Sequence, residues 1–443
     1  MKNATDASGS VDWLSLVDDS LIESLARKII ETPSPTGHEG DMARMLGEAM
    51  RSLSLDVSYQ PIYDDRINVV GSWCGTQPGP TILLSGHMDT SVSGDEDWLQ
   101  GSGWKNVATF EDGWVYGNGI FNMKGAFVSY LAMIDALQKA NFDLRGKIVV
   151  AGVVGEIELS PVDEFQGKEY DSYGVGTRFL LNHGVAADYH ILGEPSALTP
   201  LTGMMGTVWV KMTTYGDFVH TAFSGEHQDA ILNGEKLWRA LRGWREKFID
   251  EFSVSSVRAK INRAAVRGGL PWRAARTAAQ YSQYLDVRFN PAVPPIDIQR
   301  EIAEGIKSAA DSIGIPNVDV QFYMSRPGTR IPSCHPLVST IAASHEDVTG
   351  EKANVQFAPP LCTDAIDANR LGIPTVVYGP AGRAASGQRD ISRDPRAAQG
   401  EGVRLHDLKL AAAVYAETVR RLTAKSMEEM YAERLPMPSV SVE

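Results

Sequence analysis

In the first half of the chain, segments with hydrophobic residues at helical spacing alternate with short, continuously hydrophobic segments. Helical spacing of apolar residues predicts helices over residues 14–31, 41–53 and 124–140. Short apolar runs predict strands over residues 67–73, 81–85 and 147–154. The last run is almost continuously apolar, which is typical of a strand buried on both faces of a sheet. Because helices and buried strands alternate here, we expect a largely parallel or mixed sheet covered by helices.

Beyond this part of the chain the pattern changes. Apolar and polar residues alternate over residues 206–214 and 279–289, which predicts two half-buried strands. Helical spacing over residues 228–252 and 295–313 predicts two helices. Two strands and two helices in this order suit a small α+β insertion.

The α/β pattern resumes towards the C-terminal end. We expect helices there over residues 336–349 and 408–425, and a strand over residues 375–378. The simplest architecture is then one α/β domain in two parts, residues 1–203 and 325–443. An α+β domain over residues 204–324 is inserted between them.

Composition limits the partners of the protein. The chain has 443 residues, with 42 Lys and Arg against 55 Asp and Glu, and a formal net charge of -13. This acidity argues against nucleic acid, because phosphate binding needs a clustered basic surface. No apolar run is long enough for a membrane span, and the N-terminal stretch does not resemble a signal peptide. The three cysteines are far apart, so we expect reduced thiols in a cytoplasmic protein.

Charged side chains gather at the ends of the buried strands. His87 and Asp89 follow one predicted strand, Glu156 follows another, and Glu194 follows a third apolar run. Because the carboxyl ends of strands collect ligands in α/β sheets, one shared site explains all of them. An imidazole with carboxylates suits Zn²⁺ or Mn²⁺, and an open coordination position would hold the attacking water.

Two neighbouring features leave alternatives open. In extended geometry Glu156 and Glu158 point to the same face, so the residues alone do not give them separate roles. The glycine-rich turn at residues 116–125 opens a helix, but its glycine spacing fits neither standard nucleotide fingerprint. We interpret it as a tight turn that carries a site residue.

The order of these segments resembles the metallopeptidase family that contains acetylornithine deacetylase, succinyl-diaminopimelate desuccinylase, aminoacylase and the glutamate carboxypeptidases. The matching segments are spread over nearly the whole chain: residues 87–89, 119–124, 156, 193–195, 219–222, 268–269, 285–288, 362–365 and 372–374. Each motif is weak alone, whereas their combined order is specific.

The resemblance implies an α/β catalytic domain with an inserted α+β lid that dimerises. We therefore expect a homodimer or a higher homo-oligomer formed through the lid. His87 and Glu194 would bind metal, Asp89 would support the site, and Glu156 would be the general base. His220, on the lid, would stabilise the oxyanion in the active site of a neighbouring subunit.

Three positions depart from the family pattern. Asn122 stands where the family has a metal-bridging aspartate, and Ile157 stands where a second glutamate is expected, unless Glu158 replaces it. In an alternative registration Glu156 is itself the ligand. A terminal histidine ligand is missing from residues 396–403. Because an amide lacks the charge that offsets two dications, we expect one labile Zn²⁺ or Mn²⁺ per subunit, with Asn122 and Glu158 as further candidate ligands.

The sequence predicts hydrolysis of a C–N bond in a small carboxylate-bearing substrate by metal-activated water. The reaction is either amide deacylation or hydrolytic deamination, for example of an aromatic amine. Arg288, Arg330 and Tyr378 are candidates for binding the substrate, although each arginine equally suits a surface ion pair. The alternative is a catalytically silent binding protein, because loss of ligands within a retained fold would give the same pattern.

Overall fold

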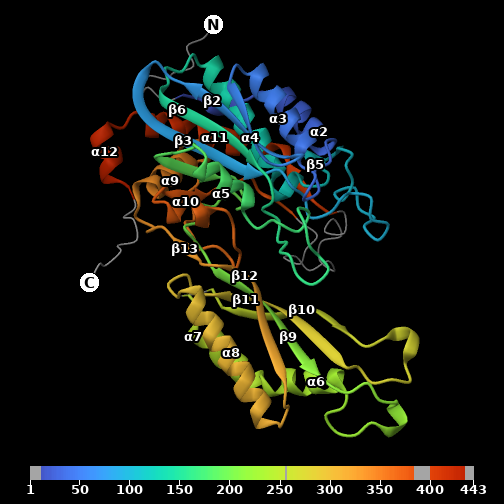
Figure 1. Cartoon of the computed structure of the whole chain (residues 1–443). Helices are drawn as coiled ribbons and strands as arrows, with labels where there is room; N and C mark the ends of the chain where they lie inside the picture. Colours follow the sequence, from blue (N-terminus) through green and yellow to red (C-terminus); the bar gives the residue numbers. More distant parts are fainter. Residues whose placement is uncertain (1–10, 255–256, 384–399, 435–443) are drawn as a thin grey trace. The chain divides into compact units, whose positions relative to one another are not determined.

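The computed structural model describes residues 11–254, 257–383 and 400–434 (Figure 1). The chain divides into two compact units. The first consists of Met1–Thr202, Ile331–Gln356 and Thr363–Glu443, and the second consists of Gly203–Arg330 and Phe357–Cys362.

A six-stranded sheet forms the centre of the first unit. Its strands are, in spatial order, β1 (Asp56–Tyr63), β2 (Arg66–Cys74), β6 (Arg145–Val153), β3 (Gln77–His87), β7 (Tyr189–Leu192) and β14 (Thr375–Val377). β2 pairs antiparallel with both β1 and β6, whereas β6, β3, β7 and β14 run parallel. The carboxyl ends of the four parallel strands therefore meet at one edge of the sheet. The mixed sheet predicted from the sequence is confirmed.

Helices surround this sheet. They are α1 (Trp13–Leu16), α2 (Asp19–Ile30), α3 (Gly40–Ser52), α4 (Gly125–Lys139), α5 (Val175–Asn182), α9 (Pro336–Thr349), α10 (Ala365–Arg370), α11 (Leu405–Thr423) and α12 (Met427–Ala432). A short irregular helix, η1 (Ile120–Lys124), leads into α4. A second, antiparallel sheet contains β15 (Gly382–Arg383), β16 (Gly402–Arg404), β5 (Trp114–Tyr116) and β4 (Thr109–Glu111), in this spatial order.

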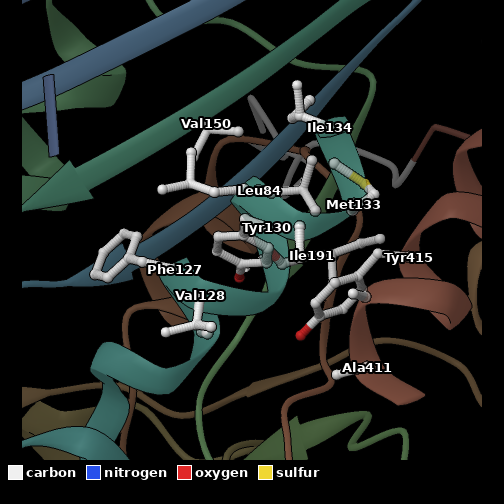
Figure 2. Close-up of a cluster of buried hydrophobic side chains, with 14 of the residues drawn as sticks. Leu84, Phe127, Val128, Tyr130, Met133, Ile134, Val150, Ile191, Ala411 and Tyr415 are labelled. Carbon is white, nitrogen blue, oxygen red and sulfur yellow. Dashed lines mark hydrogen bonds between the residues drawn. The ribbon is translucent and has the colours of Figure 1, made fainter. Parts of the chain in front are cut away.

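Alternate residues of the central strands pack into different hydrophobic clusters. Leu84 of β3 joins a large cluster with Tyr130 of α4 and Tyr415 of α11 (Figure 2). Its neighbour Leu83 joins a smaller cluster with Leu180 of α5. Because successive side chains of a strand point to opposite faces, the two clusters show that both faces of the sheet are covered. This burial explains the continuous apolar runs in the sequence.

The second unit is an α+β unit with its own core. Its sheet has the spatial order β10 (Lys260–Gly268), β11 (Gln280–Phe289), β9 (Gly206–Tyr215) and β12 (Val318–Arg326), with antiparallel neighbours throughout. Its helices are α6 (Ala230–Ala240), α7 (Arg242–Glu251) and α8 (Pro295–Ser312), with the short turns η2 (Thr221–Phe223) and η3 (Pro271–Arg273). β8 (Gly203–Met204) pairs with β13 (Thr329–Arg330). Residues such as Val210, Phe248 and Ile302 form the core.

Several predicted elements differ from the structure for local reasons. The single helix predicted over residues 14–31 is two helices, because the carboxylate of Asp18 caps the first backbone N–H groups of α2. The helix predicted over 228–252 is interrupted at Leu241, where α6 gives way to α7. The predicted insertion had two strands, whereas the sheet has four. β10 was missed because almost all its side chains are exposed and leave no apolar alternation.

The second unit extends beyond residue 324, where the sequence placed the end of the insertion. β12 continues to Arg326, and a separate short segment, Phe357–Cys362, also belongs to this unit. The roles of the two units as catalytic and lid domains stay predictions.

One helical segment of the described residues, Ile120–Lys139, has the length and apolar composition that a membrane span would need. However, 83% of its apolar window is buried inside the molecule. A helix in the core of a protein can have the same length and apolar composition, and α4 is such a helix, because it packs against β3 and α11. A cytoplasmic location stays a prediction.

Candidate metal centre

The ends of three neighbouring parallel strands bring charged side chains together. His87 is the last residue of β3, Glu156 follows β6, and Glu194 follows β7. β3 lies between the other two strands, so His87 is flanked by the two glutamates. The convergence follows from the parallel direction of the strands, because all three strands end at the same edge of the sheet.

These side chains form a compact group of possible metal ligands. In the part of the chain that the structure describes, His87, Glu156 and Glu194 are the one group of three whose ligand atoms lie within 4.8 Å of one another. His87 Nε2 lies 3.8 Å from Glu156 Oε2 and 3.7 Å from Glu194 Oε1. All three side chains are buried. The sequence prediction that they share one site agrees with this placement.

Asp89 holds the surroundings of the group in place. His87 Nδ1 donates to the backbone oxygen of Asp89 at 2.9 Å, which leaves Nε2 to face the glutamates. The Asp89 carboxylate accepts the backbone N–H groups of Glu156 and Ile157 at 3.1 and 3.0 Å. It also accepts the hydroxyl of Thr36 at 2.9 Å. Asp89 therefore joins the end of β3 to the end of β6 and fixes the position of Glu156.

Crowded charges change the protonation of the group. Burial, together with neighbouring carboxylates, raises the pKa of Glu156 well above its usual value and that of Glu194 to about 7. Burial alone would lower the pKa of His87, but the charges of Glu194 and Asp89 outweigh it and raise that pKa to about 10. Without a cation the group therefore retains protons. A divalent ion would displace them, since metal ligands bind in their deprotonated forms.

The other predicted ligands are placed differently. Asn122 is half-buried on η1, and its Oδ1 lies 3.2 Å from His87 Nε2, so the structure brings it to the group. Glu158 is exposed and does not belong to the group, although its charge contributes to the raised pKa of Glu156 and Glu194. Ile157 is buried and offers no ligand atom. Residues 396–399, part of the segment that lacks the expected histidine, lie outside the described residues.

Tyr378 does not have the position expected of a substrate-binding residue. Its side chain is fully buried in the large hydrophobic cluster, and its hydroxyl lies 2.8 Å from Nδ1 of His345. Its backbone oxygen accepts the hydroxyl of Tyr415 at 2.6 Å. No part of the ring is exposed, so Tyr378 packs as a core residue, and its role in binding a substrate stays a prediction.

Three predicted residues belong to the second unit. His220 is exposed, and its Nδ1 accepts the backbone N–H of Ala222 at 3.2 Å, which makes Nε2 the donor of a neutral ring. Arg288 forms an ion pair with Asp286 at 2.9 Å, as its structural interpretation suggested. Arg330 is exposed on β13.

Sequence reasoning gave no role to one acidic residue close to the group. Asp364 is buried, and its carboxylate accepts the hydroxyl of Thr177 at 2.5 Å. Its charge is one of the causes of the raised pKa of Glu156 and Glu194. The signal available in the sequence was its place in the segment 362–365, which matched the family pattern without indicating a role.

Comparison with known sequences identifies related proteins. The sequence model of peptidase family M20/M25/M40 matches residues 83–421. A succinyl-diaminopimelate desuccinylase of Gluconacetobacter diazotrophicus is 24% identical over 338 residues, which cover 74% of this chain and 81% of that protein. A protein of the same name from Halorhodospira halophila is 26% identical over 214 residues, which cover 47% of this chain and about half of that protein, 52%.

Solved structures share the fold at low sequence identity. A tripeptidase from Staphylococcus aureus has a TM-score of 0.71 at 18% identity, covering 93% of this chain and 100% of that one. A di-peptidase from Saccharomyces cerevisiae has a TM-score of 0.73 at 12% identity, with coverage of 93% and 99%. A dinuclear metal-binding peptidase of Bacillus subtilis has a TM-score of 0.59 at 13% identity, with coverage of 91% and 98%. The family resemblance predicted from the motifs is confirmed.

Proposed function

The chain belongs to peptidase family M20/M25/M40, a family of metal-dependent hydrolases, and from this premise we propose the bond and the residues on which it acts. We propose that it hydrolyses a C–N bond of a small carboxylate-bearing substrate by metal-activated water. The observation that carries the proposal is the buried convergence of His87, Glu156 and Glu194 at one edge of the sheet. A silent protein would have no need for this grouping of buried charges, which is costly without a cation.

The donor set fits a divalent transition metal. His87 Nε2 lies 3.7 Å from Glu194 Oε1 and 3.2 Å from Asn122 Oδ1. Two donors on a tetrahedral zinc ion, each about 2.0–2.2 Å from the metal, are separated by about 3.3–3.6 Å. We therefore assign His87, Glu194 and Asn122 as the residues that hold one ion. The neutral amide of Asn122 gives this site one negative charge fewer than an aspartate would, which favours labile binding.

Glu156 is the proposed general base. A bound cation would act as a Lewis acid and lower the pKa of a water molecule. Glu156 would accept the proton from this water and deliver it to the departing nitrogen, a role that suits a carboxyl with a raised pKa. The two backbone hydrogen bonds to Asp89 hold Glu156 and Ile157 in place and so fix the direction of the base.

Three further candidate residues belong to the second unit. The Nε2–H of His220 is the proposed oxyanion donor, contributed to a neighbouring subunit of a homodimer or larger homo-oligomer. Exposed Arg330 is the first candidate for binding the substrate carboxylate, ahead of Arg288, which already pairs with Asp286. Because two relatives carry the name succinyl-diaminopimelate desuccinylase, we favour amide deacylation over deamination as the first reaction to test.

The proposal is tested by turnover assays on metal-free and metal-loaded protein. N-succinyl and N-acetyl amino acids, dipeptides and aromatic amines would be incubated with the protein, and free amine and ammonia would be measured. We expect turnover that depends on added Zn²⁺ or Mn²⁺ and ends with a chelator. Failure to bind any divalent ion, with or without these compounds, would contradict the proposal and favour a catalytically silent binding protein.

Glu156→Gln separates the two possible roles of Glu156. If Glu156 is the base, the variant retains its metal affinity and loses about 100-fold or more of its turnover. If Glu156 is a ligand, metal affinity falls with turnover. Glu158→Gln is the matched control, because Glu158 is exposed on the same loop, and we expect little change in either quantity.

A further inference from the structure

The turn that carries Asn122 is held by a buried carboxylate, that of Glu401. Glu401 Oε2 accepts the backbone N–H groups of Phe121 and Asn122, both at 3.1 Å. The main chain of Glu401 is fixed on both sides, because its N–H donates to Gly103 and its oxygen accepts from Gly117, each at 3.3 Å. Since the residue is also buried, the carboxylate has a single defined direction.

The turn needs such an external acceptor. Asn122 (φ −116°, ψ 96°) and Met123 (φ −128°, ψ 24°) depart from helical geometry within η1. The N–H groups at the start of a helix have no acceptor within the helix. A buried N–H group without an acceptor is costly, so one carboxylate oxygen that satisfies two of them strongly favours this conformation.

A buried lysine holds the far end of the same turn. Lys124 is fully buried, and its Nζ donates to the backbone oxygens of Thr32 at 3.1 Å and Ile29 at 3.5 Å. Its positive charge is among the charges that favour the ionised form of Glu401. The turn is therefore fixed at both ends, by Glu401 at residues 121–122 and by the end of α2 at Lys124.

The side of the turn that faces the candidate metal centre contacts His87 directly. Asn122 Oδ1 lies 3.2 Å from His87 Nε2, and the backbone N–H of His87 donates to the sulfur of Met123 at 3.3 Å. An anionic ligand is drawn to a cation by its charge, whereas a neutral amide gains little in this way. The position of Asn122 therefore depends on the chain segment that carries it.

We propose that Glu401 is a positioning residue that holds the amide oxygen of Asn122 at the metal site through the backbone of residues 121–122. This inference rests on the proposed function, since it gives Glu401 a role in metal binding. It predicts that the reach of the residue-401 side chain matters more than its charge. Two substitutions separate these properties, because Glu401→Asp keeps the charge and shortens the reach, whereas Glu401→Gln keeps the reach and removes the charge.

The first measurement is the affinity for Mn²⁺ and Zn²⁺ of the full-length variants, by calorimetric titration. We expect Glu401→Asp to weaken metal binding by about 10-fold or more, which is typical when a residue that holds a ligand in place is changed. The metal affinity of Glu401→Gln should stay close to that of the wild type. Glu417→Asp is the matched control, because Glu417 is a buried carboxylate on α11 that accepts from Trp13, Arg420 and Arg421. It should alter thermal stability and leave metal affinity unchanged. Loss of affinity in Glu401→Gln alone would overturn the proposal.

The second measurement needs no metal. In crystal structures of the metal-free variants, Asn122 Oδ1 should move out of hydrogen-bonding distance of His87 in Glu401→Asp and remain in place in Glu401→Gln. An unmoved Asn122 in Glu401→Asp would overturn the inference. If the wild-type protein binds no divalent ion, the proposed function fails, whereas the position of Asn122 still decides whether Glu401 acts on this turn.

Discussion

The candidate metal centre has two sides that differ in chemistry although they belong to one site. On one side, His87 and Glu194 present an imidazole and a carboxylate, and Asp89 fixes the ring and the neighbouring loop through hydrogen bonds. On the other side, Asn122 presents a neutral amide, and buried Ile157 presents no ligand atom. A buried carboxylate supports each side, because Glu401 accepts the backbone N–H of Asn122 much as Asp89 accepts that of Glu156.

This difference indicates that the site can hold a side chain in a defined position whether or not that side chain is charged. Buried hydrogen bonds position the candidate ligands on both sides, whereas anionic candidate ligands lie on one side only. Under the proposed assignment of ligands, a site of this kind would favour one ion, held mainly by His87 and Glu194, over a pair that shares an anionic bridge.

The largest effect is expected from the side that contains His87 and Glu194. His87→Ala removes the proposed central ligand, so we expect metal affinity to fall by more than about 100-fold and turnover to be lost with it. This loss exceeds the factor of about 10–100 that is typical when a residue supporting a ligand is changed. Affinity would be measured by competition with a metal-chelating dye. His345→Gln is the matched control, because His345 is buried beside Tyr378 and does not belong to the metal-binding group, so its affinity should match wild type. Retained affinity in His87→Ala would show that the ion binds elsewhere.

The stability of the metal-free protein should decrease as the pH rises towards neutrality. The pKa of Glu194 is raised from 4.5 to about 7, as is that of Glu401. The folded state therefore binds more protons than the unfolded state between these values, and the free energy of unfolding falls over this interval. The contribution of Glu194 alone is about 2–4 kcal/mol. The contribution of His87, whose pKa is raised from 6.5 to about 10, is present below 6.5 and is lost as the pH rises through 10.

Urea unfolding of chelator-treated protein between pH 4.5 and 8 checks this dependence. Glu194→Gln should flatten it, and added Mn²⁺ should reverse it, because a cation replaces the protons of the carboxylates. A free energy of unfolding that rises with pH over this interval, without metal, would contradict the assigned protonation.

Asp89→Asn tests the hydrogen bonds that support the side with His87 and Glu194. The amide would place an NH₂ group against one of the backbone N–H groups that Asp89 now accepts, and would disturb the loop of Glu156 and Ile157. We expect metal affinity or turnover to fall by about 10–100-fold. Asp229→Asn is the control, because Asp229 also accepts two backbone N–H groups, at the start of α6. An effect no larger than that of the control would remove Asp89 from the site.

Asn122→Asp should make the two sides more alike. The added charge is expected to raise metal affinity by about 10-fold and to favour binding of a second ion. Elemental analysis of the gel-filtered variant would give the stoichiometry. Unchanged affinity and stoichiometry would mean that the residue at position 122 does not contact the ion.

Much of the fold could be predicted because its signals are local. The buried run at residues 147–154 became β6, and helical spacing identified the long helices α4, α8 and α11. β10 was missed because its exposed side chains show no apolar alternation. The break at Asp18 depends on one cap, which a periodicity over residues 14–31 does not register.

The candidate site could be predicted in part for the same reason. His87, Glu156 and Glu194 follow strand-like runs, and a parallel sheet places such ends together. The contact of Glu401 with the backbone of Asn122 joins residues far apart in the sequence, and no local pattern indicates it. The burial of Tyr378 could not be predicted, because a family motif indicates a backbone position but not the burial of the side chain.

The number of metal ions that each chain binds tests the proposed one-ion site most directly. Protein freed of metal, equilibrated with excess Mn²⁺ or Zn²⁺ and passed through gel filtration would be measured by elemental analysis, together with its turnover. We expect one ion per chain or fewer, with turnover in proportion to occupancy. Two tightly bound ions per chain would contradict the proposal that each chain holds one labile ion.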